Sequence, residues 1–146
     1  MYEQLKLDNQ ICFRIYTASR LITQAYRPLL EPLGLTYPQY LVMLVLWEHD
    51  NMTVNEIGQR LLLESNTLTP LLKRMEQNHL IVRSRGIVDS KQTLVTLTKK
   101  GRHLESCAKD IPDRLIKCCQ GKHPNTKSAA SFTAALDSMI ETLKAH

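Results

Sequence analysis

The segment between Thr53 and Thr98 limits the possible folds of this chain most strongly, because helix and strand patterns follow one another there in a fixed order. Thr53 and Glu56 have the spacing of a capping box, which predicts the start of a short helix. A turn at residues 63–65 separates it from a second predicted helix. Two short helices joined by a tight turn favour a helix-turn-helix, although an ordinary helical hairpin has the same pattern up to this point. The apolar face of the second helix would consist of Leu68, Leu71, Leu72 and Met75.

A basic hairpin follows the two helices. Residues 80–85 and 93–97 are rich in β-branched side chains and flank a loop at 86–90 with glycine and aspartate, so they predict paired strands. Helix, helix and hairpin in this order predict a winged helix that binds DNA. Asp89 is the only acidic residue of the hairpin. The positive face would be built from Lys73, Arg74, Arg83, Arg85 and Lys91.

The net charge also favours an acidic partner. The 146 residues carry a formal charge of +5, which favours nucleic acid ahead of an anionic membrane. The sequence contains no leader pattern and no apolar run of membrane-spanning length, so we expect a cytoplasmic protein that does not bind membranes. A chain of this length predicts one domain over residues 1–146.

The cysteines have none of the spacings of a metal site. No C-x-x-C motif occurs, and His103 and Cys107, one helical turn apart, have no further matched ligands. We therefore expect no metal and no cofactor, and reduced thiols in a reducing compartment. The four thiols are those of Cys12, Cys107, Cys118 and Cys119.

Apolar stripes predict long helices outside the winged helix. The first helix would run from Asp8, its N-cap, to Leu30 with one buried stripe. Thr36 and Gln39 form another capping box, ahead of a nearly wholly apolar core helix over residues 40–48. The stripe of the first helix consists of Ile11, Ile15, Ala18, Ile22, Ala25 and Leu29.

Two more striped helices follow Thr98, and Pro112 would kink the first of them. A compact unit over about residues 36–98 cannot bury three long stripes. The predicted fold is therefore mainly α, a winged helix-turn-helix whose flanking parts, residues 1–35 and 99–146, form a dimerisation region. Such a homodimer suits palindromic double-stranded DNA with half-sites about 34 Å apart, or a multiple of it. The stripes are Leu104, Cys107, Ile111, Leu115 and Cys118, then Phe132, Leu136, Met139, Ile140 and Leu143.

Two segments carry a family resemblance. Residues 33–40 read LGLTYPQY and residues 65–76 read SNTLTPLLKRME. Together with a cysteine in the first helix, they resemble the organic hydroperoxide resistance regulator branch of the MarR repressor family. The resemblance extends from Leu7 to about Cys119.

The resemblance implies a dimeric repressor that binds DNA when reduced and releases it when an organic hydroperoxide oxidises Cys12. It implies that Tyr26 and Tyr37 hydrogen-bond the sensing thiol, with Tyr16 as a further tyrosine of the pocket. In two-cysteine members of the branch, a second thiol in the helix after the wing resolves the oxidised cysteine. The candidates in this chain, in order of preference, are Cys118, Cys119 and Cys107, joined to Cys12 across subunits.

Two positions depart from the family pattern. Lys91 stands where relatives usually carry a minor-groove arginine, and it lacks the guanidinium fork. His79 stands where relatives commonly carry glycine after the recognition helix, so we expect Asn78 to adopt the left-handed conformation instead.

Helix geometry places the parts of the thiol pocket. A cap at Asp8 would put Cys12 just after the first turn, where the helix dipole favours the thiolate. Cys12 and Tyr26 are 14 positions apart, or about 21 Å along a continuous helix, so Tyr26 could meet only the Cys12 of a partner subunit. Tyr16, one turn away, can reach Cys12 within the chain.

The start of the recognition helix is expected to contact base edges or phosphates of the DNA, while Ser65 could also act as its N-cap. Lys73 and Arg74 would contact mainly phosphates. The contacting residues at the start are Ser65, Asn66, Thr67 and Thr69.

Two other functions fit parts of the sequence. A MarR-type repressor released by a small phenolic ligand would leave Cys12 without a sensing role. A thiol peroxidase would consume peroxide in many turnovers, but the thioredoxin-like alternation of strands and helices is missing, so we do not expect an enzyme.

Overall fold

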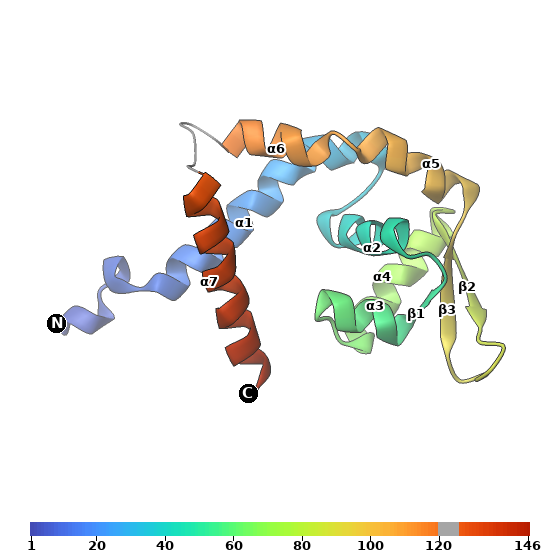
Figure 1. Cartoon of the computed structure of the whole chain (residues 1–146), viewed down its shortest axis with the longest axis horizontal. Coiled ribbons are helices and arrows are strands. Elements are labelled where there is room, and N and C mark those ends of the chain that lie inside the picture. Colours follow the sequence, from blue (N-terminus) through green and yellow to red (C-terminus); the bar gives the residue numbers. More distant parts are fainter. Residues whose placement is uncertain (120–125) are drawn as a thin grey trace. The chain divides into compact units, whose positions relative to one another are not determined.

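The computed structural model of the chain describes residues 1–119 and 126–146, and the side chains at 119 and 126–128 lie outside that description. The described residues form two units, Met1–Pro112 and Asp113–His146 (Figure 1). In the first unit, 3-10 helices lie at Glu3–Leu5, Leu7–Asn9 and Glu31–Leu33. Its α-helices are α1 (Ile11–Leu30), α2 (Tyr37–Glu48), α3 (Val54–Leu61), α4 (Ser65–Gln77) and α5 (Lys99–Ala108). Its strands are β1 (Met52–Thr53), β2 (Ile81–Arg85) and β3 (Thr93–Leu97). Helix α6 (Ile111–Cys119) begins at the unit boundary, and α7 (Thr126–Lys144) belongs to the second unit.

The core of the first unit forms around α2, as predicted. The Thr36 hydroxyl accepts a hydrogen bond from the Gln39 N–H, and the Gln39 side chain accepts one from the Thr36 N–H. This capping box starts α2 at Tyr37, three residues before the expected start, because Pro38 fits a first helical turn. The buried residues of α2 are Gln39, Tyr40, Val42, Met43, Val45 and Leu46.

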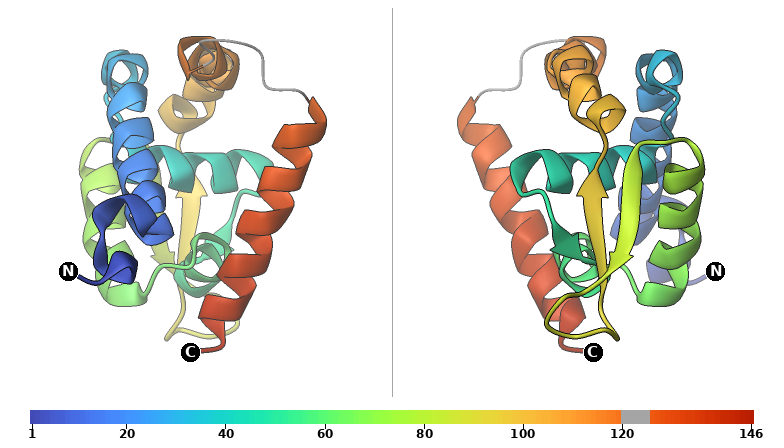
Figure 2. Two further views of the ribbon diagram at one scale, coloured as in Figure 1. Left: turned by 90° about the vertical axis from the view of Figure 1, so that its left-hand side faces the viewer. Right: turned by 90° about the vertical axis from the view of Figure 1, so that its right-hand side faces the viewer.

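The winged helix is present with the predicted order of elements. The box of Thr53 and Glu56 caps α3, and β2 pairs antiparallel with β3 in a sheet of strand order β1-β3-β2. The hairpin aligns Ile81 with Leu97 and Arg85 with Thr93. Figure 2 shows this hairpin beside α4. The mainly α, winged-helix fold is thus confirmed.

The first long helix differs from the prediction at its start. Asp8 lies in the 3-10 helix Leu7–Asn9, and α1 begins only at Ile11 with Gln10 as its N-cap residue. The predicted Asp8 cap is wrong because side-chain amides stabilise a separate turn there: Asn9 donates to the Glu3 carbonyl at 2.7 Å, and Gln10 donates to the Gln4 carbonyl at 2.6 Å.

The stripe on α1 is buried within this chain only at its C-terminal end. Leu29 is buried, whereas Ile15 and Ala25 are half-buried. Ile11 and Ile22 are exposed over 63% and 43% of their surface. In the second unit the stripe of α7 is also largely exposed, at Phe132, Met139, Ile140 and Leu143.

The helix after the wing is broken rather than kinked. Helix α5 ends at Ala108 and α6 starts at Ile111, so Pro112 lies in the first turn of a new helix. The break precedes Pro112 because a proline ring inside one continuous helix would collide with the carbonyl four residues earlier, that of Ala108. Ala108 and Ile111 are buried within the chain and Cys107 is exposed there, so burial of its stripe in a dimer stays a prediction.

His79 ends the recognition helix in the left-handed conformation, with φ of 60°, while Asn78 has φ of −84°. The expected role of Asn78 is therefore wrong. The reversal at His79 lets its N–H bond the Glu76 carbonyl at 2.9 Å and lets the Leu80 N–H bond the Met75 carbonyl at 3.0 Å. These two hydrogen bonds direct Leu80 into the core and outweigh the cost, roughly 1–2 kcal/mol, of a left-handed residue with a Cβ atom.

Among the described residues, no single helix has the length and hydropathy needed to cross a membrane. One pair of helical segments, Ile11–Leu33 and Tyr37–Glu48, reaches that length and hydropathy only when the two are taken together, and a bend of 68° separates them.

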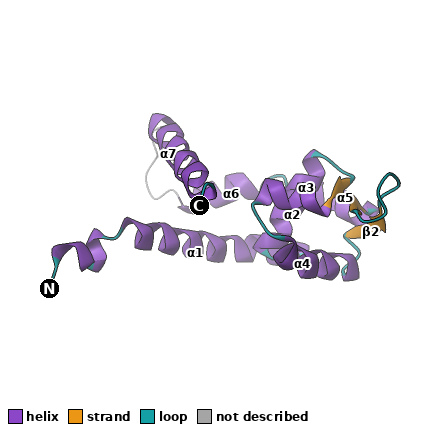
Figure 3. Cartoon of the chain, turned by 90° about the horizontal axis from the view of Figure 1, so that it is seen from below, coloured by secondary structure: helices purple, strands orange, loops and turns teal. Residues whose placement is uncertain are grey.

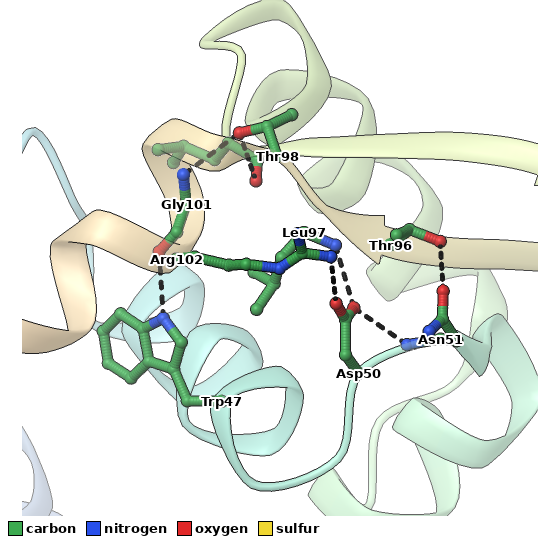
Figure 4. Close-up of polar contacts among 9 residues, drawn as sticks. Trp47, Asp50, Asn51, Thr96, Leu97, Thr98, Gly101 and Arg102 are labelled. Carbon is green, nitrogen blue, oxygen red and sulfur yellow. Dashed lines mark hydrogen bonds and ion pairs between the residues drawn. The ribbon is translucent and has the colours of Figure 1, made fainter.

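The Asp50 carboxylate joins three elements at the base of the wing (Figure 4). It accepts hydrogen bonds from the Leu97 N–H at 2.9 Å, the Arg102 guanidinium at 2.9 Å and the Asn51 N–H at 2.8 Å. Burial alone would raise the pKa of Asp50, but these three donors hold the pKa below its ordinary value of 3.8. One carboxylate therefore ties the end of α2 to β3 and α5.

We predict that Asp50→Asn lowers the free energy of unfolding by about 1–3 kcal/mol, because the amide cannot replace both charged acceptor oxygens. Since the pKa of Asp50 is lowered by folding, its stabilisation is complete above about pH 5 and is lost as the pH falls through the lowered pKa. Urea unfolding should thus show a large difference in the free energy of unfolding between Asp50→Asn and the unsubstituted protein at pH 7, and a small difference at pH 3.

Asp8→Asn is the matched control. Asp8 is exposed and caps no helix, so its substitution should leave the unfolding midpoint unchanged at both pH values. An Asp50→Asn protein as stable as the unsubstituted chain at pH 7 would contradict the role given to this carboxylate.

Candidate nucleic-acid interface and thiol site

Helix α4 presents a polar face opposite its buried face. Leu68, Leu72 and Met75 are buried, which fixes the rotation of the helix about its axis. Ser65 is the first helical residue and Glu64 is the N-cap residue, so the expectation that Ser65 caps the helix is wrong. The predicted DNA-contacting residues of α4 are all exposed: Ser65, Asn66, Thr67, Thr69, Lys73 and Arg74.

The turn before α4 is tight because two backbones approach closely. A Cβ atom on Gly58 would lie 2.8 Å from the Leu63 carbonyl oxygen, so only glycine fits there. Leu62 adopts a left-handed conformation with φ of 54°, and the Leu63 N–H donates to the Gly58 carbonyl at 3.0 Å. The sequence pattern indicated a turn here but not the left-handed leucine.

The wing carries three of the predicted residues at or beside its tip. Arg85 ends β2 and is exposed, and Asp89 and Lys91 lie in the exposed loop. The Asp89 carboxylate accepts a hydrogen bond from the Lys91 N–H at 2.9 Å. Asp89 therefore shapes the loop, and Lys91 is exposed beside it.

Arg83 points in a different direction from the one the sequence suggested. The Arg83 guanidinium lies 3.4 Å from one Glu76 carboxylate oxygen, and the Arg83 backbone N–H donates to the other oxygen at 2.7 Å. The hydrogen bond from the Arg83 backbone, followed by that from its side chain, lowers the pKa of Glu76. Only 25% of the Arg83 side chain is exposed, so in this conformation it links the wing to α4.

Sequence reasoning missed Glu76. A glutamate in the last turn of a recognition helix, seven residues before an arginine in the first wing strand, was the available signal. Next to this ion pair, a groove of about 360 Å³ runs between α3, α4 and the wing. Its lining is mainly polar and includes Thr53, Asn55, Thr69, Arg83, Asp89 and Lys91.

Cys12 lies closer to the helix terminus than predicted. It is the second residue of α1, within the first turn, where backbone N–H groups have no partners inside the helix. Its side chain is exposed, as is Tyr16 four residues on, which is 67% exposed. Phe13 beside it is also exposed.

The two tyrosines predicted to surround the thiol lie together, but not beside Cys12 of the same chain. The rings of Tyr26 and Tyr37 are 4.7 Å apart, and both lie near Tyr40, at 5.7 Å and 6.4 Å. Helix α1 is unbroken (Figure 3). The rise of about 1.5 Å per residue therefore separates the Cα atoms of Cys12 and Tyr26 by about 21 Å. A tyrosine side chain cannot span that distance.

Tyr40 extends the cluster into the core. It is 2% exposed, and burial followed by the neighbouring Tyr37 raises its pKa. Its ring lies 6.3 Å from that of Trp47, whose indole N–H donates to the Gly101 carbonyl at 3.0 Å. Tyr40 belongs to the LGLTYPQY segment, but its apolar helix suggested only a core residue.

A mostly apolar hollow of about 300 Å³ lies between α1 and the start of α2. Tyr37 lines it together with aliphatic side chains and the guanidinium-bearing Arg27. The aliphatic part of the lining comes from Leu30, Leu35 and Pro38.

The candidate resolving thiols lie in two different helices. Cys107 in α5 and Cys118 in α6 are exposed, so neither is a buried packing residue within the chain. Cys119 ends α6, and its side chain lies outside the described residues. Among the described residues, no group of three His, Cys, Asp or Glu side chains could hold a metal ion.

Comparison with known proteins places these features in one family. Residues 24–106 match the family model of the transcriptional regulator SarA/Rot. The chain is 44% identical over 142 residues to the organic hydroperoxide resistance transcriptional regulator of Bacillus subtilis, covering 97% of this chain and 95% of that protein.

Solved structures of AbfR from Staphylococcus epidermidis are also similar. Reduced AbfR bound to DNA has 38% identity and a TM-score of 0.79, over 98% of this chain and 96% of that one. Overoxidised AbfR bound to DNA has a TM-score of 0.78 at 38% identity over 97% of both chains. Disulfide-formed AbfR has a TM-score of 0.64 at 40% identity, over 94% and 95%. The chain therefore belongs to the MarR family of winged-helix transcriptional regulators, in its organic hydroperoxide resistance regulator branch.

Proposed function

We propose that this protein is a redox-sensing transcriptional repressor. Its reduced homodimer binds palindromic operator DNA, and oxidation of Cys12 by an organic hydroperoxide releases the DNA. The observation that carries the proposal is the geometry of α1, which exposes a thiol at one end and holds Tyr26 at the other. A second copy of the chain brings Cys12 to the Tyr26–Tyr37 pair.

The exposed apolar faces of α1 and α7 support the two-chain assembly. Ile11, Phe13, Leu21 and Ile22 on α1 are between 43% and 63% exposed, and Phe132 on α7 is 65% exposed. A single chain leaves this apolar surface in water, at a cost of about 25 cal/mol per Å². Dimerisation removes that cost and places two copies of α4 for two half-sites.

The proposed chemistry begins at the Cys12 thiolate. The sulfur attacks the terminal oxygen of the hydroperoxide, the O–O bond breaks, and the alcohol leaves after taking a proton. The sulfur is oxidised by two electrons to a sulfenic acid. The thiolate of Cys118 from the partner subunit then attacks that sulfur, an S–S bond forms, the S–O bond breaks, and hydroxide leaves as water after taking a proton.

Formation of the disulfide is the step that we connect with DNA release. AbfR, a relative of this chain, was solved bound to DNA in an overoxidised form and was also solved in a disulfide form. We infer that in this protein the disulfide, rather than oxidation of Cys12 alone, displaces the two α4 helices from their half-sites. Cys118 is favoured as the resolving thiol because it is exposed near the end of α6.

On DNA, the polar start of α4 reads base edges in the major groove, while Lys73, Arg74, Arg85 and Lys91 contact phosphates or the minor groove. Arg83 acts differently in this proposal. It holds the wing against α4 through Glu76 and so determines the angle between the two DNA-contacting elements.

A phenolic effector is the second candidate, favoured by the hollow beside Tyr37. Its volume of about 300 Å³, its aliphatic side chains and its cation at Arg27 suit a small aromatic acid, whereas the carboxylate of Glu31 in the same lining opposes one. In that case Cys12 has no sensing role, and salicylate would release DNA equally from the unsubstituted protein and from Cys12→Ser.

We predict that Cys12→Ser retains DNA binding but loses its response to hydroperoxide. With a palindromic duplex selected from a random pool, fluorescence anisotropy should show that one equivalent of cumene hydroperoxide weakens binding by the reduced protein at least about tenfold. Cys12→Ser should show no change, and Cys107→Ser should respond like the unsubstituted protein. Release of DNA from oxidant-treated Cys12→Ser would contradict the proposed sensor.

We predict that Cys118→Ser abolishes a crosslink between chains. After hydroperoxide treatment, a non-reducing gel should show a dimer band for the unsubstituted protein, for Cys119→Ser and for Cys107→Ser. A dimer band that persists in Cys118→Ser and disappears in Cys119→Ser would transfer the resolving role to Cys119.

A further inference from the structure

We propose that Ile87 and Val88, at the tip of the wing, form an apolar wedge that enters the minor groove of the operator. This inference rests on the proposed function, because it assumes that the protein binds DNA. In this proposal the wing makes an apolar contact with the DNA in addition to the phosphate contacts of its cations.

The exposure of these two side chains is the first observation. Ile87 is 100% exposed and Val88 is 101% exposed, which exceeds the exposure of the large apolar side chains on α1 and α7. Neither side chain packs against the fold, so core packing does not explain their presence. Two adjacent β-branched apolar residues in water favour an apolar contact with a partner.

The tip holds this pair in a closed turn. The Gly86 N–H donates to the Gln92 carbonyl at 2.8 Å, and the Gln92 N–H donates to the Asp89 carbonyl at 3.1 Å. A Cβ atom on Gly86 would lie 2.5 Å from the Asp89 carbonyl oxygen, so the turn needs glycine for this close approach. A closed turn orders the backbone before binding and lowers the entropy lost on contact.

The charges around the tip indicate DNA as the occupant. Arg85 precedes the pair, Lys91 follows it, and both are exposed. The nearest carboxylate, that of Asp89, is engaged by the Lys91 N–H at 2.9 Å. Cations on both sides would align the tip with the phosphates on either side of a groove.

The apolar patch at the tip is too small to bind another protein stably. Two aliphatic side chains cannot provide the roughly 800 Å² per partner that a stable protein interface buries. The minor groove, about 6 Å wide, admits a narrow hairpin tip, and isoleucine is among the side chains that insert between base steps there. Since α4 is the element suited to the major groove, the wing is left to reach the minor groove.

The test separates apolar from ionic affinity. Reduced full-length protein is titrated onto the selected palindromic duplex between about 50 and 300 mM salt, a range over which phosphate contacts dominate the salt dependence. For the double variant Ile87→Ser/Val88→Ser, we expect the Kd to rise about tenfold at every salt concentration, because apolar burial is lost. The slope of log affinity against log salt should be unchanged.

Two further variants are compared with it. Lys91→Gln should lower the salt slope by about one, since one phosphate contact is lost. Val82→Thr removes an exposed apolar side chain from β2, away from the tip, and should leave both affinity and slope unchanged. Netropsin, which occupies the minor groove, should weaken binding of the unsubstituted protein more than that of the double variant.

The wedge is overturned if the double variant binds the duplex as tightly as the unsubstituted protein, or if only its salt slope changes. Neither outcome affects the proposed repressor function. That function fails separately, if the reduced unsubstituted protein binds no selected duplex.

Discussion

Burial of α2 is the constraint on which the rest of the first unit depends. Tyr40, Val42, Met43 and Leu46 are at most 2% exposed, so the helix is surrounded by the elements before and after it in the chain. The capping box of Thr36 starts this helix, and the Asp50 carboxylate ties its end to β3 and α5. Helix α4 packs on α2, and the wing strand β2 packs in turn on α4.

The same helix also connects the two chemical regions of the chain. Aromatic contacts run from Tyr26 through Tyr37 and Tyr40 to Trp47, and the Trp47 indole binds the Gly101 carbonyl next to the base of the wing. Such a contiguous path couples two sites only when an element along it has two stable arrangements. In the proposed mechanism the disulfide of Cys118 displaces the two α4 helices, and Cys118 lies in α6, outside the aromatic path.

Charge and apolar surface have separate roles in this molecule. Helix α4 and the wing carry five exposed or half-buried cations, whereas many exposed apolar side chains lie on α1 and α7. The wing tip is the exception, since two aliphatic residues lie there among cations. In the proposed wedge, an apolar group between cations adds affinity that salt does not screen.

Local patterns determined much of this structure. Both capping boxes, the apolar α2, the buried face of α4 and the wing hairpin were predictable, because each depends on residues a few positions apart. The tertiary structure alone decided that Arg83 turns to Glu76, that His79 is left-handed, and that Asp50 joins three elements. The contacts of Arg83 and Asp50 depend on partners distant in sequence. The conformation of His79 depends on hydrogen bonds that stabilise the fold by more than the backbone conformation costs. The periodicity of apolar residues along the sequence contains no information about either.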